Sequence, residues 1–339
     1  MRWSTAAAFL RPALERGNLT VETGLQVQRL LIERGRAVGV AGARLGEPFE
    51  ALAEREVIVS AGAYNSPQLL MLSGVGPAEH LATREIEVAV DLPGVGQNLQ
   101  DHLNSGVIYT TDEPVSLLIG MEPEHQLEFA EQGRGPLTSN VAEAGGFWRS
   151  RPGLDSPDLQ FHAAPVMFVD EGLGDPVAHG ISFGACLLTP KSRGSVTLRS
   201  NDPSAKPWIR HSFLSDEDDV AVMMDGLRLT MDMARAPALG RYCKDAFVAP
   251  ASPEPGALRE HLARRSQTLY HPVGTCAMGS VVDAELRVLG VEALRVVDAS
   301  VMPVVPRGNT NAPTIAVAER AADLIRGRTA AAAEATVSA

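Results

Sequence analysis

The sequence predicts a mixed α/β (α+β) fold, with α/β segments near both ends and an antiparallel sheet between them. The run Glu56–Ala63 is typical of a buried strand that ends in small residues, and a helix is expected over Gln68–Leu72. This strand–turn–helix order is typical of α/β domains. Residues from about 106 to 210 alternate more, as antiparallel strands do. Leu294–Asp298 and Pro313–Ile325 indicate a second buried strand and a final helix.

Length and charge set the class of protein. The chain has 339 residues and a formal net charge of −11. At about 150 residues per domain this is two domains or one large one. The acidic balance argues against a nucleic-acid partner, which needs a basic surface. Cys186, Cys243 and Cys276 form no CxxC pair, zinc spacing or disulfide framework, so no metal site is predicted and a reducing compartment is favoured.

The first residues superficially resemble a signal peptide. Arg11 interrupts the short apolar stretch within Met1–Pro12, so a helix of a cytoplasmic protein is the better interpretation. The longest apolar runs are far shorter than the ~20 residues that span a bilayer. A cytoplasmic location is therefore predicted, with membrane association as the open alternative.

Strand-forming residues dominate the segment that follows. Leu19–Val21, Leu25–Leu30 and Ala37–Val40 are rich in them, and Glu33–Arg36 predicts the turn before the last of these. Farther along, Ser66–Pro67 is expected to supply the N-cap and first-turn proline of the helix that continues to Leu72.

The middle of the chain predicts strands and one long helix. Ile181–Leu188 and Gly194–Arg199 are expected to form hairpin-like strands around the turn Lys191–Gly194. Ser215 is expected to cap a helix whose first turn, Asp216–Asp219, complements the positive end of the helix dipole. Apolar residues then recur at helical spacing, and the methionines among them are expected to fill the core.

His271 is the first candidate for chemistry. It lies in the segment Tyr270–Gly279, where Pro272 and Gly274 predict an irregular, rigid loop. A rigid loop can fix the direction in which a histidine side chain points, and the ordinary pKa of histidine lies near neutral pH. A buried structural histidine is the alternative at this point. Gly74–Gly76 and Gly94–Gly96 only imitate a dinucleotide fingerprint and are expected to be turns.

The second candidate is the segment Arg307–Thr314, directly before the C-terminal helix. A helix N-terminus presents free N–H groups and a positive dipole end, and Asn311 adds a neutral donor and acceptor. Such a site would hold developing negative charge. A capped helix start after an Asn/Gly/Pro loop is an equally good interpretation of these residues alone.

Five ordered segments together resemble the glucose–methanol–choline (GMC) flavoprotein oxidoreductases. Gly62–Gly76 is similar to the second signature of the family, and Leu92–His102 to the segment that follows it. Three further segments resemble the C-terminal part of the family, namely Tyr270–Met278, Val297–Ser300 and Asn309–Asp323. Within the family, the sequence looks most like bacterial choline-dehydrogenase-like alcohol dehydrogenases.

The resemblance implies FAD as cofactor and oxidation of a small-molecule alcohol to an aldehyde. His271 falls on the catalytic base of the family, and hydride then passes from the alcohol carbon to flavin N5. Asn311 matches the second active-site position. The resemblance places seven residues near the cofactor, namely Val27, Ala61, Tyr270, Asp298, Ala299, Asn311 and Pro313. It does not indicate whether oxygen or a quinone accepts the electrons.

The resemblance also implies a domain division. A partial FAD-binding, Rossmann-like domain is expected over 1–105, an antiparallel substrate-binding domain over 106–281, and a return to the FAD-binding domain over 282–328. The low-complexity composition separately predicts a disordered tail over 329–339. Substrate-pocket candidates are Arg149, Phe161, His162 and Phe168, for which surface and core positions are equally good explanations.

A GxGxxG unit, with which family members begin, does not occur in the sequence. The chain is therefore expected to correspond to the C-terminal portion of a GMC enzyme that lacks this dinucleotide-binding segment. Two alternatives to a self-sufficient enzyme follow. One is a non-catalytic fragment, or one half of a two-chain enzyme with an N-terminal partner segment. The other is a non-redox lyase of the same fold.

Overall fold

The computed structural model describes residues 3–328. The first sheet along the chain is three-stranded and antiparallel. Its strands are β1 (Leu25–Glu33), β2 (Arg36–Arg44) and β3 (Glu47–Leu52). A short helical segment precedes it and comprises Ala6–Leu10 and α1 (Arg11–Leu14). The predicted turn between the first two strands is confirmed, whereas Leu19–Val21 forms no strand.

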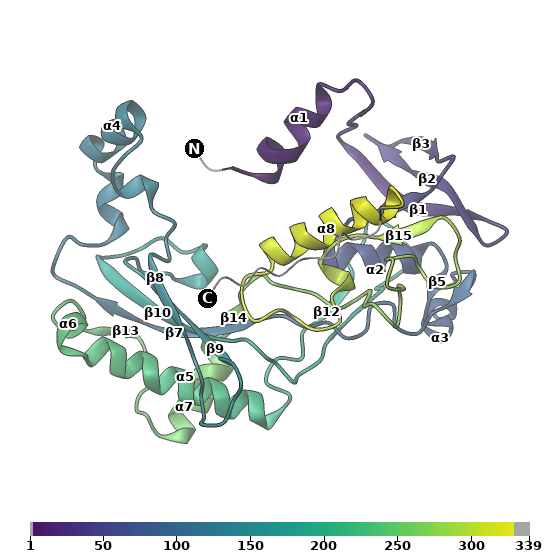
Figure 1. Cartoon of the computed structure of the whole chain (residues 1–339). Coiled ribbons are helices and arrows are strands. Elements are labelled where there is room, and N and C mark those ends of the chain that lie inside the picture. The colour runs from purple at the N-terminus through teal and green to yellow at the C-terminus, as the bar shows by residue number, and fades with distance from the viewer. Residues whose placement is uncertain (1–2, 329–339) are drawn as a thin grey trace, which may run out of the picture.

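Two parallel strands from distant parts of the chain lie beside this sheet. Strand β4 (Val57–Val59) pairs with β15 (Leu294–Val296), and helices α2 (Gly62–Leu72) and α8 (Asn311–Ile325) lie next to them (Figure 1). Val59, Leu70 and Val296 share one buried apolar core. The chain thus leaves this core after α2 and returns to it near its C-terminus.

Helix α2 begins earlier than the sequence predicts. Ser66 and Pro67 lie inside the helix, so their predicted roles as N-cap and first-turn residue are wrong. Proline has no N–H to donate to the carbonyl four residues before it. The carbonyl of Ala63 instead accepts the Thr275 hydroxyl at 2.6 Å. The backbone of the helix is satisfied by a loop from the far end of the chain.

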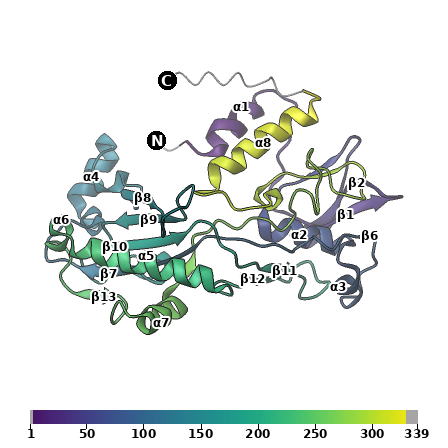
Figure 2. The same ribbon diagram turned by 60° about the horizontal axis from the view of Figure 1, so that its bottom comes forward.

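A six-stranded antiparallel sheet forms the second region (Figure 2). Its order is β13-β7-β10-β9-β8, with β14 also paired to β7. The bounds are β7 (Leu103–Thr110), β8 (Ala144–Trp148), β9 (Leu159–Ala164), β10 (Gly180–Leu187), β13 (Ala246–Val248) and β14 (Gln267–Thr268). Helix α5 (Glu217–Arg235) packs on β7 and β10, and α7 (Pro255–Arg265) packs on α5.

Two predictions in this middle region are wrong in detail. Strand β11 (Ser195–Thr197) does not pair with the Ile181–Leu188 segment but with β12 (Trp208–Arg210), so no hairpin forms. Asp216, not Ser215, is the N-cap of α5, because its carboxylate accepts the Asp218 N–H at 2.9 Å.

The remaining elements are short helices, strands and turns. They are β5 (Val75–Gly76), α3 (Ala78–Ala82), β6 (Val90–Asp91), α4 (Pro123–Gln132), α6 (Pro237–Gly240) and four 3₁₀ turns at Leu117–Met121, Pro136–Thr138, Asp170–Gly172 and Ala299–Val301. Within residues 3–328, no helix combines the length and apolar character needed to cross a membrane. The predicted tail over 329–339 lies outside the described residues, and the four-part domain division stays a prediction.

Candidate active site

The loop that carries His271 is held between two structural regions. Thr268 of β14 pairs with Leu103 of β7, so the residues that follow β14 lie beside those that precede β7. The backbones of Gln100 and Val273 exchange two hydrogen bonds, at 2.9 and 3.1 Å. This local pairing brings His102 and His271 together.

The ring of His271 is buried, with 9% of the residue exposed. Its Nδ1 atom lies 2.9 Å from Nδ1 of His102, and the two rings meet edge to face at 85°. Its Nε2 atom lies 3.4 Å from the amide nitrogen of Asn309. Burial and, secondly, the charge of His162 lower the pKa of His271. The imidazole is therefore held neutral, which is the form that can accept a proton.

Asp101 holds the His271 loop from the backbone side. Its Oδ1 atom accepts the His271 N–H at 2.8 Å, and its Oδ2 atom accepts the Thr268 hydroxyl. Nδ1 of His211 lies 3.5 Å from the same Oδ2, and Nε2 of His211 lies 3.2 Å from the Tyr64 hydroxyl. Burial raises the pKa of Asp101, while these donors and the His211 charge favour its ionised form.

Asn309 is the asparagine that the structure places at His271. Its side-chain oxygen lies 3.5 Å from Nε2 of Gln160 on β9, so it bridges the sheet and the histidine. Asn311, the residue predicted for this role, is the exposed first residue of α8. In the sequence, Asn309 only begins one of the family-like segments, and the Asn-Thr-Asn spacing alone does not distinguish the two asparagines.

Asp298 forms a structural connection. Its Oδ2 atom accepts the Gly62 N–H at 2.9 Å and the Ser66 hydroxyl at 2.5 Å, and its Oδ1 atom accepts the Ser300 N–H at 2.8 Å. A buried carboxylate with several donors is well satisfied. Asp298 thereby fixes the end of β15 against the start of α2, which positions Ala61.

The other five residues predicted near the cofactor lie on five separate segments. Val27 is 39% exposed on β1, and Ala61 is exposed just beyond the end of β4. Tyr270 is 56% exposed and precedes His271 with a positive φ of 62°. Ala299 and Pro313 are half-buried, in the 3₁₀ turn after β15 and in the first turn of α8.

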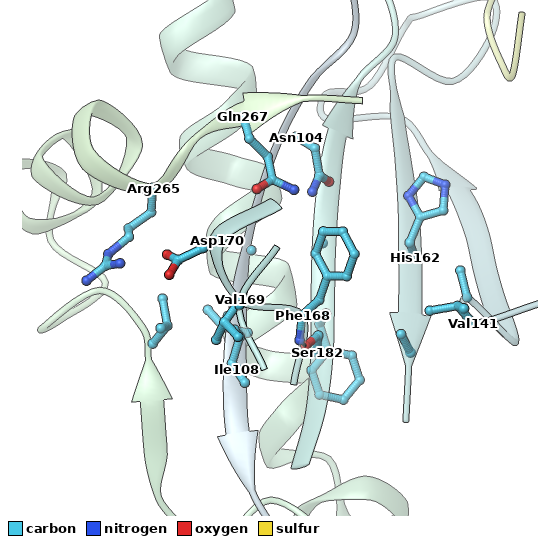
Figure 3. A pocket seen from close by; sticks show the side chains of 18 of the residues that line it. Asn104, Ile108, Val141, His162, Phe168, Val169, Asp170, Ser182, Arg265 and Gln267 are labelled. Carbon is cyan, nitrogen blue, oxygen red and sulfur yellow. Dashed lines mark hydrogen bonds between the residues drawn. The ribbon is translucent and has the colours of Figure 1, made fainter. Parts of the chain in front are cut away.

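A cavity of about 740 Å³ lies on the sheet between β7, β9 and β10. Figure 3 shows Asn104 and Gln267 at one end, Phe168 beside Ser182 in the middle, and His162 on β9. His162 and Gln160 alternate with Phe161 on β9, so they share one face of the sheet. Because Gln160 contacts Asn309, the cavity and His271 lie at the same face.

Two of the four pocket candidates are placed elsewhere. His162 and Phe168 line the cavity. Phe161 points to the opposite face of β9 and packs in the core beneath the sheet. Arg149 is exposed, and its guanidinium donates to the Asp155 carbonyl at 3.1 Å.

The N-terminal and C-terminal profiles of the family described as GMC oxidoreductase match residues 1–104 and 190–318. The chain belongs to the GMC oxidoreductase family. An uncharacterised GMC-type oxidoreductase of Mycobacterium tuberculosis is 48% identical over 337 residues, covering 96% of the chain and 63% of its own length. The chain therefore spans about three fifths of the length of such relatives.

Two further relatives carry enzyme names. An alcohol dehydrogenase [acceptor] of Pseudomonas putida is 41% identical, and an oxygen-dependent choline dehydrogenase of Rhizobium etli is 43% identical. Each match covers 96% of this chain and 61% of the relative.

Solved structures agree with the family. Pyridoxine 4-oxidase from Mesorbium loti superposes with a TM-score of 0.84 and 28% identity, over 97% of this chain and 62% of that one. A variant of formate oxidase from Aspergillus oryzae, studied for FAD modification, gives a TM-score of 0.86 and 26% identity, over 92% and 61%. FAD is the cofactor of this family.

The residues present fit one side of an FAD site. In open α/β sheets, ligands bind beyond the carboxyl ends of the parallel strands. There, Gly62 has a φ of 81°, and a Cβ on it would meet no atom within 4 Å among the described residues. A Cβ on Gly308, which precedes the N-terminus of α8, would likewise meet no atom within 4 Å among the described residues. Small residues with open space before them suit a flat ring system, and the helix N-terminus suits its electron-rich edge.

Proposed function

We propose that this chain carries the base and the substrate pocket of an FAD-dependent oxidoreductase that acts on the CH–OH group of a donor and yields an aldehyde. The observation that carries the proposal is the position of His271. Its Nε2 atom faces Asn309, while its other nitrogen and its backbone are held by His102 and Asp101.

The chain's residues supply the proton chemistry. FAD, when bound, would supply the acceptor for the hydride that leaves the alcohol carbon. Nε2 of His271 takes the hydroxyl proton, so that the C–O bond becomes a carbonyl as the C–H bond breaks. The amide of Asn309 orients the alcohol oxygen and the His271 ring. Asn311, at the N-terminus of α8, supports negative charge that develops on the cofactor.

The cavity supports a small alcohol as substrate. Phe168 and Val177 offer apolar surface, and Asn104, His162 and Ser182 offer neutral polar groups, a mixture typical of small-molecule sites. The Pseudomonas relative is named an alcohol dehydrogenase and the Rhizobium relative a choline dehydrogenase, and these names support an alcohol as the substrate. Oxygen and a quinone both remain candidate electron acceptors.

Anaerobic mixing with a panel of primary alcohols tests the proposal. Flavin bound to the protein is expected to lose its oxidised absorbance, and an aldehyde is expected to form in equal amount. A flavin that no alcohol reduces, together with cleavage of a cyanohydrin, would instead support the non-redox lyase of the same fold.

A second proposal concerns FAD affinity. Among the described residues, β4 pairs with no named strand other than β15, and Ile58 of β4 is 45% exposed. Parallel strands are normally covered on both faces. We infer that this surface is completed by an N-terminal partner segment carrying the GxGxxG unit. Without this segment the chain is expected to bind FAD weakly, so flavin reduction is measured with the segment present.

Adding FAD to the purified chain, with and without such a segment, tests this inference. A flavin spectrum that requires the segment supports it, and stoichiometric FAD binding by the chain alone contradicts it.

A further inference from the structure

His102 occupies an unusual position relative to the base. It lies directly before β7, and none of the residue is exposed to solvent. Its Nδ1 atom faces Nδ1 of His271 at 2.9 Å. At this distance a hydrogen bond joins the two nitrogens, so one ring must donate and the other must accept.

Only one direction of this hydrogen bond leaves a working base. A neutral imidazole carries a single proton on one of its two nitrogens. If His271 donates through Nδ1, its Nε2 atom keeps a lone pair and can take the proton of an alcohol. If His102 donates, His271 carries its proton on Nε2 and cannot accept another there.

The surroundings of His102 are consistent with the first direction. Its Nε2 atom is buried and has no hydrogen-bond partner within residues 3–328. The backbone carbonyls of Leu188 and Pro306 interact with the ring and favour its protonated form. Carbonyl oxygens only accept, so these surroundings favour an N–H group on this ring over a bare nitrogen. Which of the two rings donates is fixed by the groups on the other side of His271.

The amide groups on the other side of His271 select the first direction. The Asn309 nitrogen, which can only donate, faces Nε2 of His271 at 3.4 Å. The Asn309 oxygen faces the amide nitrogen of Gln160 at 3.5 Å. All four side chains therefore have consistent donor and acceptor roles from Gln160 through to His102.

We propose that His102 is a positioning residue that sets the tautomer of His271, holding its proton on Nδ1 so that Nε2 is free as the base. Burial, with the His271 charge as the second cause, lowers the pKa of His102 to about 4. His102 therefore stays neutral and keeps accepting. Once His271 has taken a proton, the same hydrogen bond has a charged donor and becomes stronger.

Nitrogen NMR of the full chain labelled with ¹⁵N-histidine tests the proposal directly. The pattern of two-bond couplings distinguishes the two neutral tautomers of each ring, and His102→Gln and His271→Gln assign the signals. We expect His271 in the Nδ1–H form and His102 in the Nε2–H form. Signals for His271 in the Nε2–H form would overturn the proposal.

A pair of variants tests whether His102 is what fixes the tautomer of His271. His102→Gln keeps an oxygen that can accept from Nδ1–H, so the His271 tautomer is expected to persist. His102→Leu removes the acceptor, so His271 is expected to shift toward the Nε2–H form. His179, which pairs with Ser116 at 2.7 Å, is the internal control and should not change. An unchanged His271 tautomer in His102→Leu would contradict the proposed role.

The proposed role in catalysis rests on the proposed function, but the tautomer does not. The NMR measurement uses neither flavin nor alcohol, whereas the proposed function is judged by flavin reduction. A chain that shows the expected tautomer yet reduces no flavin would retain this inference and lose the proposed reaction.

Discussion

The side-chain nitrogen of Asn309 lies 3.4 Å from Nε2 of His271, although 38 positions separate the two residues. The contact joins the loop before α8 to the loop after β14. It places a neutral donor at the nitrogen that we assign as the base, and it leaves Asn311 two residues farther along at the helix start.

Asn309→Ala is therefore expected to slow flavin reduction by alcohol. In its proposed role Asn309 donates to the alcohol oxygen as negative charge develops there. Loss of one hydrogen bond to such a charged group costs about 1.5–3 kcal/mol, which corresponds to a roughly 10- to 150-fold slower reduction. Asn311→Ala is the matched control, and its exposed position predicts a smaller effect. Stopped-flow absorbance measures both rates. A larger loss in Asn311→Ala would return the role to Asn311.

The pH dependence of the reduction rate should follow the protonation of His271. Burial and the charge of His162 lower its pKa, and the base works only when neutral. The rate is therefore expected to be constant at neutral pH and to fall only below the ordinary histidine value of about 6.5.

His162→Gln removes the second of these causes, so the acidic limb of the profile should move to higher pH. Rates measured across pH 4–8 in both proteins provide the comparison. A limb that moves to lower pH in the variant would contradict this assignment.

Asp101 should matter for stability as well as for the site. Asp101→Ala removes the acceptor of the His271 N–H and the Thr268 hydroxyl. Leaving buried donors unsatisfied costs about 1–3 kcal/mol each, so the free energy of unfolding should fall by roughly 2–5 kcal/mol.

The control is Asp112→Ala, which breaks an exposed ion pair with Lys244 and should leave stability unchanged. Urea unfolding followed by circular dichroism measures both. Equal urea midpoints for Asp101→Ala and the unaltered chain would show that this carboxylate does not contribute to the free energy of unfolding.

The sequence predicted the mixed fold because local patterns mark strands and helix starts. β15 and α8 lie close to their predicted positions, since each has a clear apolar run. The pairing of β11 with β12 was missed because strand pairing depends on contacts between distant residues, which periodicity does not encode. Likewise, Ser66 resembles an N-cap locally, but its hydroxyl is used by Asp298 from 232 positions away.

His271 could be singled out from its rigid loop, but its environment could not. Asp101 and His102 reach it from the segment before β7, and Asn309 reaches it from the loop before α8. Only the folded chain brings their donors and acceptors together. The distinction between Asn309 and Asn311 depends on where α8 begins, and helix ends are the least certain feature of a sequence prediction. The two pocket candidates on β9 also could not be separated from the sequence. Side chains alternate along this strand, so that Phe161 packs in the core and His162 lines the cavity.

The most direct test of His271 as the base is the anaerobic rate of flavin reduction by alcohol in His271→Ala and in the unaltered protein, each with FAD bound. Removing a general base is expected to lower this rate by about 10²- to 10⁴-fold, with the oxidised flavin spectrum otherwise retained. Reduction at an undiminished rate in His271→Ala would remove His271 from the mechanism.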